Sequence, residues 1–261
     1  MIKLHIFGSC SGTEPYPDRH HASFAIELNN GIYWLDAGEN CSYTAYLMGV
    51  DLLKVRNIFI SHCHMDHVGG LGNLLWNIRK VSKVQGRPPV QDPIEVYIPY
   101  PEVYQAVMQV LAYTEENFRC SYDHRVYPVS DGILYRGQYD PITVEALHNH
   151  HLHHEEGTPW RSFAYRFFVE DKSIIYSGDT QLEDIDYVVP EECDVLLMET
   201  GHHKAENVCK YLIGHHKKVK QLIFIHHGVE ILNSPEEEEK KARKCWDGKL
   251  LIAHDAMTVT L

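Results

Sequence analysis

The residues best suited to chemistry lie in one short stretch between two apolar segments. Three histidines and one aspartate fall within six residues in the order His-x-His-x-Asp-His, namely His62, His64, Asp66 and His67. Neutral imidazole and carboxylate are ligands that first-row divalent metals prefer, zinc first among them. Four such groups packed unpaired near a core would cost several kcal/mol. The spacing therefore predicts a metal site.

The segments on either side of this cluster predict how it is held. Residues 55–60 are apolar and β-branched and predict a buried strand. Residues 68–76 turn through glycines and then take up a helical period. The cluster is therefore expected on a tight strand-to-helix turn, where nearby side chains can converge on one point.

The other ligand-type residues also fall where predicted strands end. Asp36 follows residues 32–35, and five histidines follow residues 142–147 in the tract 148–154. The remaining two are Asp179, in a Ser-Gly-Asp-Thr stretch after residues 173–176, and His226 after residues 219–225. A strand-end aspartate can simply cap a turn, and a histidine tract can be a solvated metal scavenger. Because independent surface residues would not all fall at strand ends, we expect them to belong to one site.

The rest of the chain predicts one mixed domain covering residues 1–261, because no linker or composition break divides it. Antiparallel strands are expected near each end of the chain, with helices between them, which favours two sheets with helices outside. The expected helices are residues 42–54, 71–82, 101–113, 205–213 and 235–244.

Composition limits the classes of function. The chain has 261 residues, 44% of them hydrophobic, and a formal net charge of −12. That net charge is opposite in sign to the net charge of most proteins that bind long nucleic acids. No apolar run reaches 18 residues, so we expect no membrane span. Seven scattered cysteines and a strand-like N-terminus predict a cytoplasmic protein with reduced thiols.

With these elements in order, the sequence resembles the metallo-β-lactamase-fold hydrolases. The matching elements are Asp36, the 62–67 cluster, a histidine of the 148–154 tract, Asp179 and His226. Gly8-x-x-x-Gly12 with Arg19 and Ser23, together with Ser177-Gly178-Asp179-Thr180, look most like the branch containing RNase Z and small phosphodiesterases. The resemblance implies an α+β fold, an αββα four-layer sandwich of two mixed sheets flanked by helices, with a dinuclear metal site.

Carried over by position, the resemblance implies two divalent ions, with zinc expected and manganese or iron as alternatives. His62, His64 and a tract histidine would hold one ion, and Asp66, His67 and His226 the other. Asp179 would bridge them, and Asp36 would orient a ligand imidazole. In the tract we favour His150, because Leu147-His148-Asn149-His150 resembles the family's ending; His151 and His148 are the rivals. His226 is favoured over His227, because it directly follows the apolar strand.

The implied mechanism is hydrolysis by a hydroxide shared between the two ions, because metal binding lowers the pKa of water to about 7. Asp66 would orient the attacking water and is our catalytic candidate together with His202, a candidate proton donor; His203 is its rival. No serine or cysteine nucleophile is needed, so Cys63 is expected to be a packed residue.

The expected substrate is a small phosphodiester or nucleotide, because the closest-looking branch hydrolyses phosphodiesters. Long nucleic acid is disfavoured by the acidic charge and by the lack of a basic, Gly/Pro-rich arm. The alternatives are an RNase Z-type tRNA 3′ endoribonuclease, a thioester or lactone hydrolase, diiron redox chemistry and a non-enzymatic metal-binding protein. The sequence leaves a homodimer open.

Overall fold

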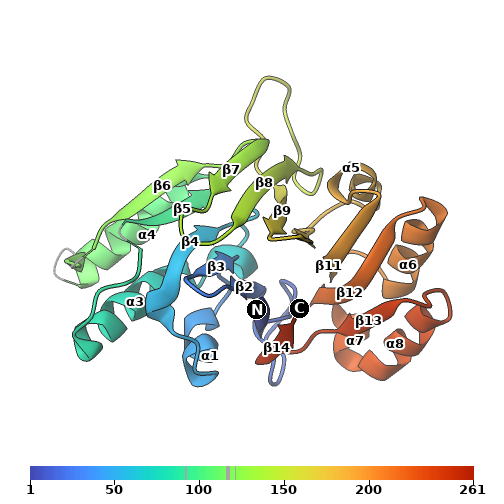
Figure 1. The fold of residues 1–261 in the computed structure, drawn as a ribbon, viewed down its shortest axis with the longest axis horizontal. Coiled ribbons are helices and arrows are strands. Elements are labelled where there is room, and N and C mark those ends of the chain that lie inside the picture. The colour runs from blue at the N-terminus through green and yellow to red at the C-terminus, as the bar shows by residue number, and fades with distance from the viewer. Residues whose placement is uncertain (92, 116–117, 121) are drawn as a thin grey trace. The chain divides into compact units, whose positions relative to one another are not determined.

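A computed structural model of the protein describes residues 1–91, 93–115, 118–120 and 122–261. The chain forms two compact units. The first contains Met1–Gly8, Asp18–Pro128 and Asp255–Leu261, and the second contains Ser9–Pro17 and Val129–His254. Each unit is built on one seven-stranded sheet (Figure 1).

The sheet of the first unit has the strand order β14-β1-β2-β3-β4-β5-β6. Its strands are β1 (Lys3–Gly8), β2 (Ser23–Glu27), β3 (Ile32–Leu35), β4 (Val55–Phe59), β5 (Ile94–Ile98), β6 (His124–Pro128) and β14 (Met257–Thr260). From β14 to β3 the pairing is antiparallel, and from β3 to β6 it is parallel, so the sheet is mixed. Every residue of β3 and β4 is buried, as expected for central parallel strands.

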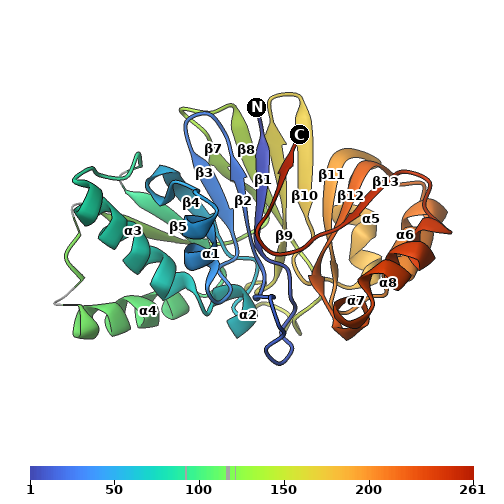
Figure 2. The same ribbon diagram turned by 90° about the horizontal axis from the view of Figure 1, so that it is seen from below.

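The helices of the first unit bury an apolar stripe against this sheet. They are α1 (Cys41–Leu47), a 3₁₀ turn (Leu52–Lys54), α2 (Met65–Val68), α3 (Leu71–Gln85) and α4 (Pro101–Thr114). In α3 the buried positions include Leu71, Leu74, Leu75 and Ile78, the i, i+3, i+4, i+7 spacing of one helical face. Figure 2 shows α1, α3 and α4 along the same side of the sheet.

One expected helix of this unit is shorter than predicted. Residues 42–54 were expected to form a single helix, but α1 ends at Leu47 and a separate 3₁₀ turn begins at Leu52. Gly49 lies between them with a φ of 77°, a left-handed conformation that glycine adopts at little cost and that ends an α-helix.

The sheet of the second unit has the order β13-β12-β11-β10-β9-β8-β7. Its strands are β7 (Gly132–Arg136), β8 (Ile142–His148), β9 (Phe163–Val169), β10 (Lys172–Tyr176), β11 (Glu192–Thr200), β12 (Lys218–His227) and β13 (Lys249–Ile252). From β7 to β10 the pairing is antiparallel, and from β10 to β13 it is parallel. This sheet is therefore also mixed.

The second unit has its own apolar core between its sheet and its helices. The helices are α5 (Ile185–Val188), α6 (Ala205–Gly214), α7 (Val229–Asn233) and α8 (Pro235–Arg243), with a 3₁₀ turn at Leu182–Asp184. Val208 and Leu212 of α6 and Ala242 of α8 pack in one cluster with Leu196 and Phe224 of the sheet.

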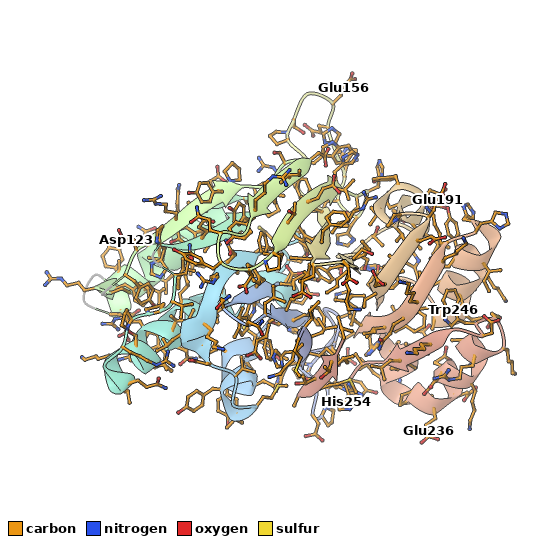
Figure 3. The ribbon with its side chains drawn as sticks, in the orientation of Figure 1. Asp123, Glu156, Glu191, Glu236, Trp246 and His254 are labelled. Carbon is orange, nitrogen blue, oxygen red and sulfur yellow. The ribbon has the colours of Figure 1, made fainter. Side chains whose placement is uncertain are left out.

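In both units most ligand-type residues lie at or just after the carboxyl ends of parallel strands; His226 was expected just after its strand but is the next-to-last residue of β12. Such ends lie along one edge of a sheet, which is where open α/β sheets bind ligands. The histidine tract instead begins at the end of antiparallel β8 and enters a long loop, with Glu156 at its exposed tip (Figure 3). Among the described residues, none of the helices is long and apolar enough to cross a membrane.

Candidate metal centre

In the first unit, the loop after β4 is bound by its backbone to the loop after β3. The amide of Ala37 donates to the His67 carbonyl at 2.6 Å, and the amide of Gly70 donates to the Ala37 carbonyl at 2.7 Å. A Cβ on Gly70 would lie 2.1 Å from the carbonyl oxygen of Gly38, so only glycine permits this approach. The glycines after the His-x-His-x-Asp-His cluster therefore let the two loops meet.

Asp36 is the residue that orients this loop. Its carboxylate is fully buried and accepts from the Ser61 amide at 2.6 Å, the Ser61 hydroxyl at 2.6 Å and Nδ1 of His67 at 2.7 Å. Because a carboxylate only accepts, Nδ1 of His67 carries the proton and Nε2 carries the lone pair. The predicted hydrogen bond between Asp36 and an imidazole of the cluster is present, and it has the form of a carboxylate–histidine pair at a metal site.

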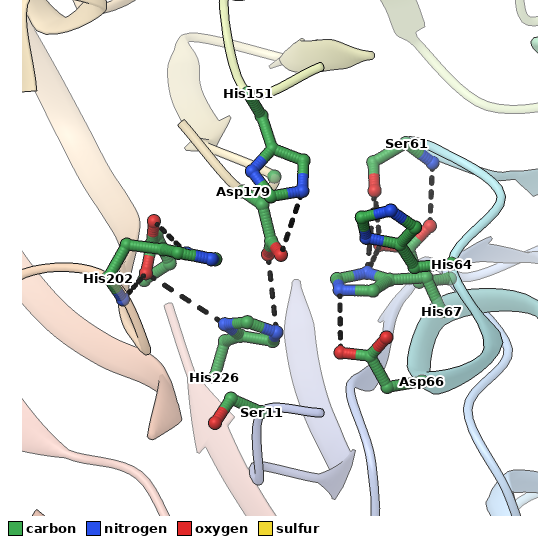
Figure 4. Close-up of polar contacts among 12 residues, drawn as sticks. Ser11, Ser61, His64, Asp66, His67, His151, Asp179, His202 and His226 are labelled. Carbon is green, nitrogen blue, oxygen red and sulfur yellow. Dashed lines mark hydrogen bonds and ion pairs between the residues drawn. The ribbon is translucent and has the colours of Figure 1, made fainter. Parts of the chain in front are cut away.

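The side chains of His64, Asp66 and His67 in this loop lie close together (Figure 4). Nε2 of His62 is 3.0 Å from Nδ1 of His64, and Nε2 of His67 is 3.3 Å from Oδ2 of Asp66. Two nitrogens bound to one tetrahedral zinc at 2.0–2.1 Å would be about 3.3 Å apart. Both pairs therefore have the separation of donors that share an ion.

In the second unit, Asp179 lies between two imidazoles. It lies three residues after the end of β10 at Tyr176, and Gly178 before it has a φ of 56° that makes the turn. Oδ1 of Asp179 is 3.3 Å from Nε2 of His226, and Oδ2 is 3.7 Å from Nε2 of His151 (Figure 4). Because each carboxylate oxygen faces a different imidazole, the arrangement suits a carboxylate shared by two ions.

His226 and Asp36 have unusual backbone conformations for their residue types. Their φ angles are 48° and 49°, in the left-handed region that residues other than glycine rarely adopt. Such strain persists where the surrounding structure imposes it, and it is common at functional sites. Neighbouring His227 has ordinary structural partners, since its ring nitrogens bond Thr200 Oγ1 at 2.9 Å and the Ala253 carbonyl at 2.8 Å.

The three candidate histidines of the tract, His150, His151 and His148, have different surroundings. Nδ1 of His150 bonds Oδ1 of Asp184 at 2.5 Å, and 54% of the His150 side chain is exposed. The His151 side chain is 10% exposed and belongs, with Asp179 and His202, to a group whose donor atoms lie within 4.8 Å of one another. His148 is held by Asp131 at 2.7 Å and stacks on Trp160. The local geometry therefore favours His151 as the donor.

Glu199 is a buried carboxylate that the sequence analysis did not single out. Its Oε1 accepts from Nδ1 of His202 at 2.9 Å, and its Oε2 accepts from the His202 amide at 2.9 Å. Burial opposes ionisation of Glu199, but hydrogen bonds from His202 and His226 outweigh it and lower its pKa to about 2. The same hydrogen bond raises the pKa of His202. The sequence signal that could have identified Glu199 is its position in the largely apolar strand 194–199, where a charged residue is rarely buried without a function or a partner.

The donors in both units fit divalent metal ions. They are imidazole nitrogens and carboxylate oxygens, and most lie at strand ends. In some of the imidazoles, one ring nitrogen makes a hydrogen bond to a carboxylate and the other is the proposed metal donor. Within the second unit, Glu199, His202 and His226 form a further group with donor atoms within 4.8 Å. The cysteines near the first cluster do not join these groups among the described residues, so the chemistry is that of a nitrogen and oxygen site.

Comparisons with known proteins identify a matching family and similar proteins. A family model described as anti-Pycsar protein Apyc1 matches residues 2–243. Ribonuclease Z of Picrophilus torridus is 24% identical over 202 residues, which cover 77% of this chain and 58% of that protein. The first three curated relatives are matched over 45–63% of their own length.

Solved structures establish the fold. The metallo-β-lactamase-fold protein YhfI of Bacillus subtilis superposes with a TM-score of 0.73 at 18% identity, covering 99% of this chain and 98% of that one. Yeast PDE1 superposes with a TM-score of 0.71 at 15% identity, covering 100% and 99%. The prediction of a metallo-β-lactamase fold with two mixed sheets and flanking helices is confirmed.

Proposed function

The chain belongs to the family described as anti-Pycsar protein Apyc1, and from that membership we propose that it hydrolyses a small phosphodiester. Cyclic nucleotides are the first class of substrate, because the degradation of cyclic nucleotides associated with Apyc1 fits a small phosphodiester. The observation that carries the proposal is Asp179, whose two oxygens each face an imidazole in the way that a carboxylate shared by two ions requires.

The proposed ligands are the donors that the family resemblance assigns. They are His62, His64, Asp66 and His67 in the first unit, and a tract histidine, Asp179 and His226 in the second. By the family resemblance, His62, His64 and a tract histidine would hold one ion, Asp66, His67 and His226 would hold the other, and Asp179 would be shared; within the tract we propose His151. His151 replaces our earlier candidate His150, because His151 is little exposed and lies in a donor group with Asp179 and His202, whereas none of the donor groups among the described residues contains His150.

The protein's residues then have distinct tasks. When bound, divalent ions supply a water of lowered pKa and polarise the phosphorus–oxygen bonds. Asp66 orients the attacking water. His202, held by Glu199, offers a proton to the leaving oxygen, and its raised pKa keeps it protonated nearer neutral pH. Asp36 holds His67 in the tautomer that leaves Nε2 for the metal.

A small substrate fits the charge of the chain better than a long nucleic acid. The formal net charge is −12, whereas proteins that bind nucleic-acid backbone neutralise phosphates with lysine and arginine. The described residues between β5 and β6 contain helix α4 and no extended basic arm. A tRNA endonuclease is the second candidate, and the similarity to proteins named ribonuclease Z favours it.

A substrate panel tests the proposal. The full chain, loaded with zinc or manganese, is assayed on cyclic nucleotides, bis-p-nitrophenyl phosphate, a thioester, a lactone and precursor tRNA. We expect turnover of cyclic nucleotides and of bis-p-nitrophenyl phosphate. The Asp66→Ala variant, purified in the same way, controls for contaminating activity.

Other outcomes would replace the proposal. Turnover of only the thioester or the lactone would exclude a phosphodiesterase. Accurate cleavage of precursor tRNA with no cyclic-nucleotide turnover would favour the endonuclease. Two equivalents of iron together with oxygen consumption would assign the protein to the redox class.

A further inference from the structure

Asp184 accepts more hydrogen bonds than a residue that only caps a helix. It lies at the end of the 3₁₀ turn before α5 and is 2% exposed. Its carboxylate accepts five hydrogen bonds. The donors are His150 Nδ1 (2.5 Å), the His150 amide (2.9 Å), Thr180 Oγ1 (3.0 Å), the Gln181 amide (3.0 Å) and the Tyr187 hydroxyl (3.1 Å).

Four of these five donors come from two segments that each carry a proposed metal ligand, and the fifth, Tyr187, lies in α5. His150 precedes His151, and Thr180 follows Asp179. Three of the hydrogen bonds converge on Oδ2 of Asp184, one from the first segment and two from the second. A single oxygen atom thus connects the loop after β8 with the loop after β10.

The side chain of His150 is held by this contact and not by burial. More than half of its surface is exposed, yet both its ring and its amide bond Asp184. Because a carboxylate only accepts, Nδ1 of His150 must be the donor. His150 therefore acts as a tether from the tract to Asp184, while its neighbour His151 faces Asp179 at 3.7 Å.

We propose that Asp184 is a positioning residue that fixes the separation of His151 and Asp179, and so prepares them to bind metal. The inference rests on the proposed function, since it takes both residues as ligands. A carboxylate suits this task because it accepts from several donors at once, and charge-assisted hydrogen bonds are about twice as strong as neutral ones. Hydrogen-bond partners of metal ligands typically contribute 10–100-fold to metal affinity, and Asp184 would act on His151 and Asp179 through their chain neighbours.

The test measures zinc affinity of the metal-free full chain in competition with a chelating dye. Asp184→Asn keeps the shape of the side chain but loses the charge and one acceptor oxygen. We expect its affinity for at least one zinc ion to fall by about 10–100-fold. Asp194→Asn is the matched control, because Asp194 also accepts from a backbone amide and a hydroxyl, those of Ser173. Its affinity should stay within about twofold of wild type.

A second variant keeps the test decisive if Asp184→Asn folds poorly. His150→Ala removes only the exposed tether and should also weaken zinc binding. His148→Ala is its control, because His148 makes the same pair of contacts, from its ring and its amide, with Asp131. Thermal unfolding without metal should be similar for His150→Ala and His148→Ala. Wild-type affinity in both Asp184→Asn and His150→Ala, or an equal loss in the controls, would overturn the inference.

Failure of the proposed function would look different. A wild-type chain that binds no zinc, or an Asp179→Asn variant that binds two ions as tightly as wild type, would remove the proposed metal site itself. Normal binding by wild type, loss in Asp179→Asn and no loss in Asp184→Asn would reject only the positioning role.

Discussion

At the scale of single residues, buried carboxylates do more than bind metal. Asp36 holds His67, Glu199 holds His202 and Asp184 holds His150, in each case through Nδ1 of the ring. Each hydrogen bond fixes the orientation and the tautomer of an imidazole. In the proposed site, the orientation of these three histidines therefore depends on the buried carboxylates behind them.

Replacing a proposed ligand in the first cluster should remove turnover without unfolding the protein. His64→Ala and Asp66→Ala should each lower kcat by more than about 100-fold, since losing even an outer partner of a ligand costs 10–100-fold. His64 is exposed and Asp66 is partly exposed, so the core is untouched. Phosphodiesterase kinetics and bound metal measure this. Met65→Ala, between them and 74% exposed, is the control that should stay active. Near-normal turnover in either ligand variant would count against the mechanism.

His202 should matter most when the leaving group needs a proton. His202→Ala should lower turnover of a cyclic nucleotide by about 100-fold or more, the usual contribution of a general acid. The loss should be much smaller with bis-p-nitrophenyl phosphate, because p-nitrophenolate leaves as a stable anion. Parallel kcat measurements on both substrates make the comparison. Equal losses on the two substrates would instead mean that His202 acts as a ligand or in folding.

At the scale of elements, the first cluster depends on how closely two loops of one sheet approach. Gly70→Ala would place a Cβ 2.1 Å from the Gly38 carbonyl, and neither backbone can move cheaply. We expect a loss of about 1–3 kcal/mol in unfolding free energy, measured by urea denaturation. Gly214→Ala is the control, because nothing lies within 4 Å of that position at the end of α6. It should be neutral or raise stability by up to about 1 kcal/mol. Equal stability of the two variants would refute the steric argument.

The pairing of β1 with β2 should make stability depend on pH. Burial alone would raise the pKa of Glu27, but the hydrogen bond from His5 and the charges of Lys3 and Lys54 outweigh it and lower the pKa below 4.5. A carboxyl with a lowered folded-state pKa contributes stability above its unfolded value and loses it as pH falls through the folded value. Glu27→Gln should therefore be less stable than wild type at pH 7, with the difference shrinking below about pH 4.5.

Denaturation curves of the metal-free chain between pH 3 and pH 7 measure this effect. Glu156→Gln, at the exposed tip of the loop between β8 and β9, is the control and should follow wild type at every pH. A constant difference between Glu27→Gln and wild type down to pH 3 would contradict the prediction.

At the scale of the whole molecule, metal should add to stability as well as activity. A ligand that binds only the folded state stabilises it by about 2.7 kcal/mol when its free concentration is one hundred times Kd. For a chain of this size that corresponds to about 5–10 °C in Tm. Chelation should therefore lower Tm by this amount and abolish turnover, and zinc or manganese should restore both. Calorimetry and activity on one sample check this; an unchanged Tm would argue against bound ions in the folded protein.

Much of the fold follows from the sequence, because apolar periodicity and turn residues act locally. The strand before the His-x-His-x-Asp-His cluster, the helix after it and the strand before Asp179 were all predicted within a few residues of their bounds. The strands β6 and β7 were not predicted. Both are half-exposed, and each lies at an edge of its sheet, so their sequences lack the apolar signal of a central strand.

The sequence alone also determined which residue types could bind metal, since the His-x-His-x-Asp-His spacing and the strand-end aspartates carry that information themselves. Only the tertiary structure gave His150 and His151 different surroundings and brought out Glu199 and Asp184, because these features depend on partners 3 to 34 positions away in the chain. A histidine next to a histidine looks the same in sequence whichever one a distant carboxylate holds. That choice is made by folding, when separate strands bring their loops together.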